Sequence, residues 1–114
     1  MTNDRDHFSD YREQTRVKHE ILEKYLKAYF HILKNHSNEL IFIDGFAGQG
    51  TYNDGATTYP GSPIRALQLI ADDSNFINCI STIFIEKDIQ LFETLSDSVQ
   101  NFYHNHPEIR EPQL

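Results

Sequence analysis

Ile-Phe-Ile-Asp-Gly-Phe-Ala-Gly-Gln-Gly, residues 41–50, is the stretch of sequence that decides the fold of this chain. Leu40 to Asp44 is a short apolar run, and its adjacent large side chains predict a strand buried on both faces, as in the centre of a parallel sheet. The glycines that follow predict a sharp turn at the carboxyl end of this strand, where open α/β sheets bind ligands. We therefore expect a nucleotide-type cofactor loop at this point.

The distribution of glycine supports this expectation. All five glycines of the chain lie between Gly45 and Gly61. Such a concentration indicates a backbone that needs unusual dihedral angles or a close approach to a ligand. We expect residues 45–62 to form one long loop.

A long amphipathic helix is predicted before the strand, from about Thr15 to Asn35. Its apolar residues recur at steps of three and four, which is the helical period. They are Val17, Ile21, Leu22, Tyr25, Leu26, Tyr29, Phe30 and Leu33. We interpret this stripe as core packing, and we interpret Lys18 and His19, near the start of the helix, as solvated side chains.

The segment after the glycine loop predicts a helix, a strand and a second helix. Ser62-Pro63 opens the first of these helices, with Ser62 as the N-cap. Ser81 to Ile85 predicts the strand. Asp88 is the expected cap of the last helix, which His106-Pro107 ends.

The predicted order is therefore helix, strand, helix, strand, helix. Two strands joined by a crossover helix form a right-handed βαβ unit, so the expected fold class is α/β with an incomplete parallel sheet. Residues 15–106 are expected to form this partial domain. We expect a flexible N-terminus at residues 1–14 and a loose C-terminal tail at residues 107–114. The 114 residues have room for one small domain.

Composition argues against several classes of function. The net charge of −7 argues against direct nucleic-acid binding through a broad basic surface. No stretch approaches the roughly 20 apolar residues of a membrane span, and the polar N-terminus lacks the apolar core of a secretion signal. Cys79 is the only cysteine and the histidines lack zinc-type spacing, so we expect no metal site. A reducing cytoplasm is the expected location.

Two acidic residues at the predicted strand tips indicate which cofactor the loop takes. Asp44 repels a pyrophosphate but suits an amino group or a hydroxyl, which favours S-adenosylmethionine over a dinucleotide. Glu86 can accept hydrogen bonds from both ribose hydroxyls of an adenosine moiety. Taken alone, the glycines could form only a tight turn, and Glu86 could be only a solvated charge at the end of a strand. Their combination is the stronger signal.

Asp-x-Phe-Ala-Gly-x-Gly at residues 44–50 resembles motif I of class I S-adenosylmethionine-dependent methyltransferases. The chain also carries Lys18-His19-x-x-Leu22-x-x-Tyr25-Leu26, then Gly61-Ser62-Pro63, then Phe84-Ile85-Glu86. This order is similar to the N-terminal part of the three-Cys-motif partner protein (TcmP) family, over about residues 15–103. The family's members are bacterial proteins with a methyltransferase-like domain, so the resemblance implies a Rossmann-like transferase fold.

The resemblance implies roles only at matched positions. Asp44 would approach the methionine amino group, Gly48 and Gly50 would line the methionine and ribose, and Glu86 would bind the ribose hydroxyls. Lys87 stands where methyltransferases often place an apolar residue over the adenine, which is a departure from the pattern. The cofactor-binding residues expected on this basis are Asp44, Gly45, Phe46, Ala47, Gly48, Gly50, Glu86 and Lys87.

The resemblance stops short of catalysis. The sequence has no Asn/Asp-Pro-Pro-Tyr motif and no Pro-Cys pair, and it predicts far fewer strands than a full methyltransferase fold has. We therefore expect the S-adenosylmethionine-binding half of such a domain, with the catalytic half elsewhere. Expected partners are that C-terminal half, a three-cysteine-motif protein, or a second copy of this chain. The catalytic residues are not predicted.

Two other functions stay open on the sequence alone. One is a non-catalytic interaction module that pairs with another chain through its helix or its sheet edge, because two strands leave backbone groups unpaired. The other is a nucleotide-binding enzyme that uses NAD or ATP. Against it, the chain lacks the full Gly-x-Gly-x-x-Gly pattern and any Gly-Lys-Ser/Thr phosphate loop.

Overall fold

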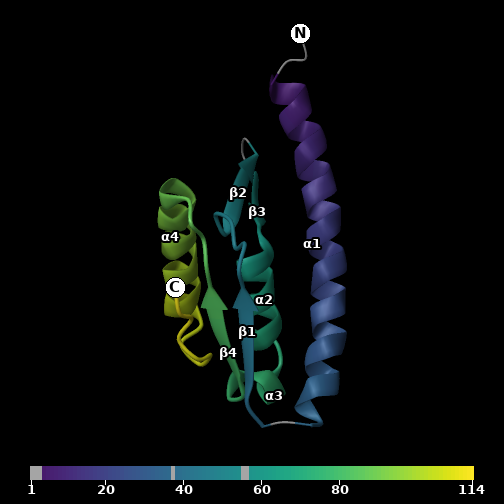
Figure 1. Ribbon diagram of the computed structural model, residues 1–114, viewed down its shortest axis with the longest axis vertical. Helices are drawn as coiled ribbons and strands as arrows, with labels where there is room; N and C mark the ends of the chain where they lie inside the picture. Colours follow the sequence, from purple (N-terminus) through teal and green to yellow (C-terminus); the bar gives the residue numbers. More distant parts are fainter. Residues whose placement is uncertain (1–3, 37, 55–56) are drawn as a thin grey trace.

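The computed structural model describes residues 4–36, 38–54 and 57–114, and Figure 1 shows their arrangement. The elements in chain order are α1 (Asp4–Lys34), β1 (Leu40–Asp44), β2 (Thr51–Asp54), β3 (Thr57–Pro60), α2 (Ser62–Ala71), α3 (Ser74–Ile77), β4 (Ile80–Phe84) and α4 (Ile89–Asn105). None of the described helices is both long enough and apolar enough to cross a membrane.

A small parallel sheet organises the fold. β1 and β4 pair in parallel, with Leu40 opposite Ile80 and Asp44 opposite Phe84. α2 lies between these two strands in the chain, which is the crossover that a parallel pair requires. The prediction of a mixed α/β chain with a small parallel sheet is confirmed.

The first helix is longer than predicted. α1 begins at Asp4 rather than near Thr15, and it ends at Lys34, close to the predicted end. The sequence from Asp4 to Thr15 contains no glycine or proline. Once the later turns are fixed by packing, each added residue contributes one more backbone hydrogen bond, so the helix extends toward the N-terminus. Figure 1 shows its first turns reaching past the rest of the molecule.

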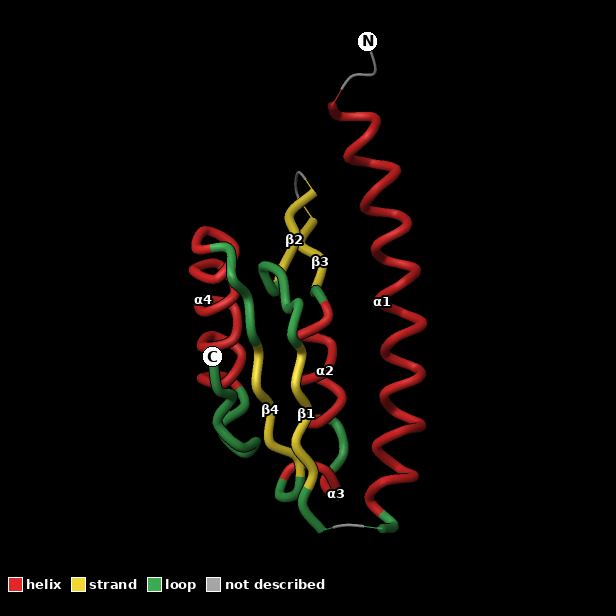
Figure 2. The backbone as a smooth tube through the Cα atoms, in the orientation of Figure 1, coloured by secondary structure: helices red, strands yellow, loops and turns green. Residues whose placement is uncertain are grey.

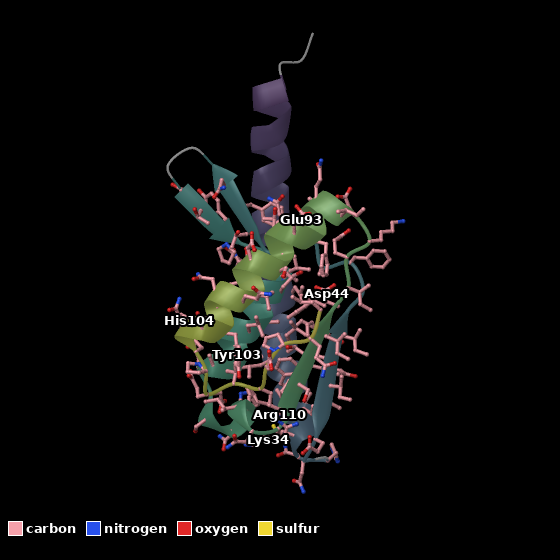
Figure 3. All side chains as sticks on the ribbon, turned by 90° about the vertical axis from the view of Figure 1, so that its left-hand side faces the viewer. Lys34, Asp44, Glu93, Tyr103, His104 and Arg110 are labelled. Carbon is pink, nitrogen blue, oxygen red and sulfur yellow. The ribbon has the colours of Figure 1, made fainter. Side chains whose placement is uncertain are left out.

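The core lies on one face of the sheet. Phe84 of β4 is fully buried, and Phe42 of β1 meets the rings of Phe30 on α1 and Phe84 at centroid distances of 6.0 and 6.4 Å. Leu95 and Val99 of α4 belong to the same buried cluster. Figure 3 shows the sheet at one side of the molecule, with the helices gathered to its left.

The opposite face of the sheet is bare, so the prediction that β1 is buried on both faces is wrong. Ile41 and Ile43 of β1 are 66% and 58% exposed. Ile85, just after β4, is half exposed. The reason is that the described helices cover a single face, so residues of alternating parity along β1 meet opposite environments.

The segment predicted as one long loop contains a hairpin. β2 and β3 pair antiparallel, with Thr51 opposite Pro60 and Tyr52 opposite Tyr59. Their threonines and tyrosines favour strands, although their polarity hides the pattern. Figure 2 shows the hairpin rising beyond the carboxyl ends of β1 and β4. The short helix α3 was also not predicted.

The predicted caps have different outcomes. The Asp88 carboxylate accepts a hydrogen bond from the Leu91 amide, so this predicted cap is confirmed. Ser62 is not the N-cap of α2, because Gly61 takes that position without a side-chain bond. The Ser62 hydroxyl instead donates to the Asp44 carboxylate at 2.9 Å. A charged oxygen is a stronger acceptor than the competing local groups.

The C-terminal segment is held in place, contrary to the prediction of a loose tail. Gln113 forms a parallel bridge with Ile83, on the edge of β4 opposite β1. Ile109 is buried. Arg110 Nη2 donates to Glu39 Oε1 at 3.0 Å and also to the Asn78 carbonyl. Figure 2 shows this segment returning from α4 toward β4.

One buried thiol lies at the start of β4. Cys79 is a free cysteine and is 9% exposed. Its Sγ donates to the Asn75 carbonyl at 3.1 Å. Its own carbonyl accepts the Leu40 amide at 2.7 Å, so this residue sits where β1 and β4 begin to pair.

Candidate functional site

The glycine loop after β1 has the unusual backbone that the sequence predicts. Gly48 and Gly50 have φ angles of +73° and +84°, in the left-handed region that favours glycine. A Cβ atom on Gly48 would lie 2.9 Å from the Tyr52 hydroxyl, and one on Gly50 would lie 3.0 Å from Cβ of Ser98 on α4. Both glycines therefore serve the packing of the loop against the protein itself.

Glu86 ties the loop after β1 to the segment after β4. Its Oε1 accepts the Gly48 amide at 2.9 Å, and its Oε2 accepts the Asp88 amide at 3.0 Å. The Ala47 amide also donates to the Ile85 carbonyl at 3.1 Å. The structure thus brings together the glycine loop and the acid at the tip of the next strand. A carboxylate has about four acceptor positions, so Glu86 retains capacity for ligand hydroxyls.

Asp44 occupies the tip of β1, and Figure 3 labels it near the carboxyl end of the sheet. Its Oδ1 accepts the Phe46 amide at 3.0 Å, and its Oδ2 accepts the Ser62 hydroxyl at 2.9 Å. The carboxylate is therefore fixed between its own loop and the start of α2. These two bonds leave acceptor positions for a third donor.

A cavity of about 530 Å³ opens beside Asp44. This volume lies within the range of about 300–1,000 Å³ that is typical of small-molecule sites. It is bounded by α1, the carboxyl end of β1, the loop that follows, β2 and the start of α2. The lining residues are Lys18, His19, Leu22, Phe42, Ile43, Asp44, Gly45, Phe46, Ala47, Tyr52 and Ser62.

The cavity separates the predicted site residues into two groups. Asp44, Gly45, Phe46 and Ala47 line it. Gly48, Gly50, Glu86 and Lys87 do not line it. Gly50 packs against Ser98 of α4, whereas Gly48 donates its amide to Glu86 and its Cβ position faces the Tyr52 hydroxyl. Phe46 lines the cavity and still has 90% of its surface exposed.

Sequence reasoning missed the α1 side of the cavity. Lys18 is exposed but lines the cavity, and His19 is half-buried rather than solvated. Helical spacing was an available signal, because Leu22 follows these residues by four and three positions and points to the same cavity. Tyr52 gave no such signal, since its place depends on the hairpin.

Burial lowers the pKa of His19 below its ordinary value of 6.5. The nearby Arg65 guanidinium lowers it further, and the Asp44 carboxylate partly offsets both effects. Arg65 is held in place, since it donates to Glu23 at 3.0 Å and to the Pro60 carbonyl at 3.1 Å. The lowered pKa favours the neutral imidazole, and the His19 ring centroid lies 6.0 Å from that of Tyr52.

Within the part of the chain that the structure describes, no group of three His, Cys, Asp or Glu residues could hold a metal ion. Comparisons with protein-family models, with curated proteins and with solved structures find no match for this chain.

Proposed function

We propose that this chain is the S-adenosylmethionine-binding half of a methyltransferase-like domain, similar to the three-Cys-motif partner protein family. The observation that carries the proposal is the hydrogen bond between Glu86 and the Gly48 amide, beside the cavity at Asp44. It places an acid from one parallel strand against the glycine loop of the other. Open α/β sheets bind nucleotides at the carboxyl ends of such strands.

The residues fit the two ends of the cofactor. The ribose hydroxyls would donate to Glu86, and the cationic amino group would approach Asp44. Gly45 has nothing within 4 Å of a Cβ position, so the backbone here is open to a ligand. Lys87 is exposed and offers no apolar cover for the adenine. We therefore expect the adenosine end to be held mainly by its ribose.

The proposal concerns binding rather than turnover. When bound, S-adenosylmethionine supplies an electrophilic methyl group. The sequence contains neither the Asn/Asp-Pro-Pro-Tyr motif nor the Pro-Cys pair that would act on a methyl acceptor. A bacterial cytoplasmic setting and a complementary catalytic half belong to the same proposal.

Titration calorimetry with S-adenosylhomocysteine tests the proposal on the full chain. We expect one binding site and loss of the signal in Glu86→Ala. Glu108→Ala is the matched control, because Glu108 is an exposed acid after α4, away from the loop. Circular dichroism establishes that each variant is folded. Absence of heat from folded wild-type protein rejects the proposal.

A second candidate function is an interaction module that adds a partner chain's strand beside β1. The Leu40 amide and the Asp44 carbonyl bond toward β4, so by alternation the backbone groups of Ile41 and Ile43 point to the other edge. No described residue pairs with that edge. A strand added there would gain main-chain hydrogen bonds, and the exposed isoleucine side chains would contact the partner.

Light scattering over a concentration series and affinity capture with an Ile41→Lys/Ile43→Lys control test this second function. A defined complex that the double variant abolishes supports it. A second copy as the bound species would identify the complex as a homodimer. A strictly monomeric chain that captures no partner rejects it.

A further inference from the structure

The first helix carries more apolar surface than the fold covers. Leu22, Leu26 and Phe30 of α1 belong to the core or pack against it. A second set of large apolar side chains on the same helix is exposed. These are Val17, Ile21, Tyr25, Tyr29 and Ile32. Core packing is the wrong prediction for the first four of them.

The exposed residues lie on one face of α1, which we call the outer stripe. They recur at steps of four, four, four and three residues, and residues three or four apart are neighbours on the surface of a helix. The rings of Tyr25 and Tyr29 stack along the stripe, with their centroids 5.6 Å apart. Figure 1 shows α1 at the right-hand edge of the molecule, with no other described element beyond it. A helix with apolar residues on two faces is expected to be covered on both.

The outer stripe has the size of a protein–protein contact. Its central side chains, Ile21 and Tyr25, are 63% and 62% exposed. With the other three side chains, the stripe presents on the order of 600 Å², the upper end of the apolar patches that monomers expose. Two such stripes face to face would bury roughly 1,200 Å² in total, which is the lower limit for a specific interface. A second copy of the stripe is therefore a partner of sufficient size.

The spacing of the outer stripe is self-complementary when two copies of α1 run antiparallel. With a two-fold axis midway between Ile21 and Tyr25, Ile21 of each copy lies at the level of Tyr25 of the other. Val17 then lies at the level of Tyr29 of the other copy. Each contact occurs twice and pairs a branched aliphatic side chain with an aromatic ring. This is the pattern of an isologous two-fold interface.

Charged residues beside the outer stripe favour the antiparallel direction. Glu20, Lys24 and Lys27 are exposed, and none of them forms an ion pair with a residue that the structure describes. In the antiparallel pair, Glu20 of each copy lies at the level of Lys24 and Lys27 of the other, which is attractive. In a parallel pair in register, each of these residues would lie beside its own copy, which is repulsive.

We propose that this chain forms an antiparallel two-fold dimer through the outer stripe of α1. The inference goes beyond the proposed function, because the contact needs neither a cofactor nor the residues of the cavity. It also differs from strand addition at the edge of β1, because it uses no residue of the sheet. The long first helix then has two roles, since one face completes the core and the other joins two copies.

Sedimentation equilibrium of the full chain over a concentration series tests the dimer. We expect a monomer–dimer equilibrium with a Kd on the order of 1–100 μM, as for an interface of small area. Ile21→Lys/Tyr25→Lys should weaken it by at least about 100-fold, because four lysines then meet at the centre of the contact. Ile41→Lys/Ile43→Lys is the matched control, since it places the same charges on exposed side chains of β1. We expect the control to leave the Kd unchanged, and circular dichroism establishes that each variant is folded.

Chemical cross-linking tests the direction of the two helices. Tyr25→Cys and Ile32→Cys are each made in a Cys79→Ser background, which removes the one native thiol. In the antiparallel pair, the two copies of position 25 lie about 6 Å apart along the helix axis, and the two copies of position 32 lie about 27 Å apart. A short bifunctional maleimide should therefore join the copies at position 25 and fail at position 32. Cys79→Ser alone is the control and should give no cross-link.

The remaining outcomes overturn the inference. One is wild-type protein that stays monomeric up to about 1 mM. Another is a dimer that Ile21→Lys/Tyr25→Lys leaves intact, or that the β1 control abolishes. Equal cross-linking at positions 25 and 32 overturns the antiparallel arrangement. None of these results bears on S-adenosylhomocysteine binding, so the proposed function stands or falls separately.

Discussion

The same tripeptide, Ile-Phe-Ile, occurs in β1 at residues 41–43 and around the end of β4 at residues 83–85. Phe42 and Phe84 meet ring to ring in the core, whereas Ile41, Ile43 and Ile85 are at least half exposed. Phe84 is fully buried, whereas Ile41 is 66% exposed. The comparison teaches that an apolar run specifies a strand, while burial of each face depends on what covers it.

The edges of the two strands differ in the same way. The outer edge of β4 receives Gln113, whose amide donates to the Thr82 carbonyl at 2.9 Å. The outer edge of β1 has no strand partner among the described residues. The covered face and the C-terminal edge are therefore the stable side of the sheet. The isoleucine face and the β1 edge are the side available for association.

The largest difference between the two faces should appear on removing one large side chain from each. Phe84→Ala should lower the free energy of unfolding by about 3–5 kcal/mol, because it removes a buried ring from the core. Ile43→Ala should change it by less than about 0.5 kcal/mol, because the side chain is more than half exposed. Urea denaturation followed by circular dichroism measures both. Similar losses would mean that the isoleucine face is covered in solution.

The next largest effect on stability is expected from alanine substitution at one of two glycines of the loop. Gly50→Ala should cost more than about 1 kcal/mol, since its φ of +84° strains an L-residue and Ser98 is already close. Gly45→Ala has open space and should stay within about 0.5 kcal/mol. Thermal melts of the two variants provide the comparison. A Gly50→Ala protein as stable as the wild type would contradict the packing of the loop against α4.

The pH dependence of stability should depend on His19, which is half-buried and lines the cavity beside Asp44. Because its folded pKa is below 6.5, the unfolded state binds more protons in the window just under that value. Stability should therefore rise with pH through this window and fall on acidification. His19→Gln should flatten the profile, and His104→Gln, an exposed histidine of α4, should leave it unchanged. Denaturation midpoints between pH 5 and 8 are the measurement.

The smallest effect is expected at the foot of the sheet, where Figure 3 labels Arg110. Its hydrogen bond holds the pKa of Glu39 below the ordinary 4.5. The contribution to stability is present above that value and is lost as the pH falls through the lower, folded pKa. Glu39 is exposed and the Arg110 side chain is about one-third exposed, so Arg110→Met should shift the melting temperature only slightly at pH 7. A large loss would show that the Asn78 contact of Arg110 holds the C-terminal segment.

Local chemistry explains which elements the sequence predicts. β1, α2, β4 and α4 follow from apolar period, from Pro63 at a helix start and from the Asp88 cap. The β2–β3 hairpin was missed because Thr51 and Tyr52 are polar enough to look like a loop. The bare face of β1 was missed because Ile41 and Ile43 are as apolar as buried strand residues, and the sequence of a strand does not reveal how many layers cover it.

Local sequence also explains which part of the candidate site was predicted. Asp44 and Glu86 stand at strand ends, where local sequence gives their position. The Gly48–Glu86 contact then follows from the parallel pairing of the two strands. Lys18 and Tyr52 reach the cavity from distant segments, so their roles depend on tertiary packing that no short motif encodes.

The thiol of Cys79 makes local opening of the sheet measurable by chemical labelling. It is the only thiol in the chain, it is buried, and its carbonyl holds the first hydrogen bond between β1 and β4. A thiol reagent in water can react with it only when the foot of the sheet opens. The rate of labelling therefore reports one local opening event, without any added probe. Slower labelling in the presence of a ligand would measure how far binding at the other end of the strands stiffens their junction.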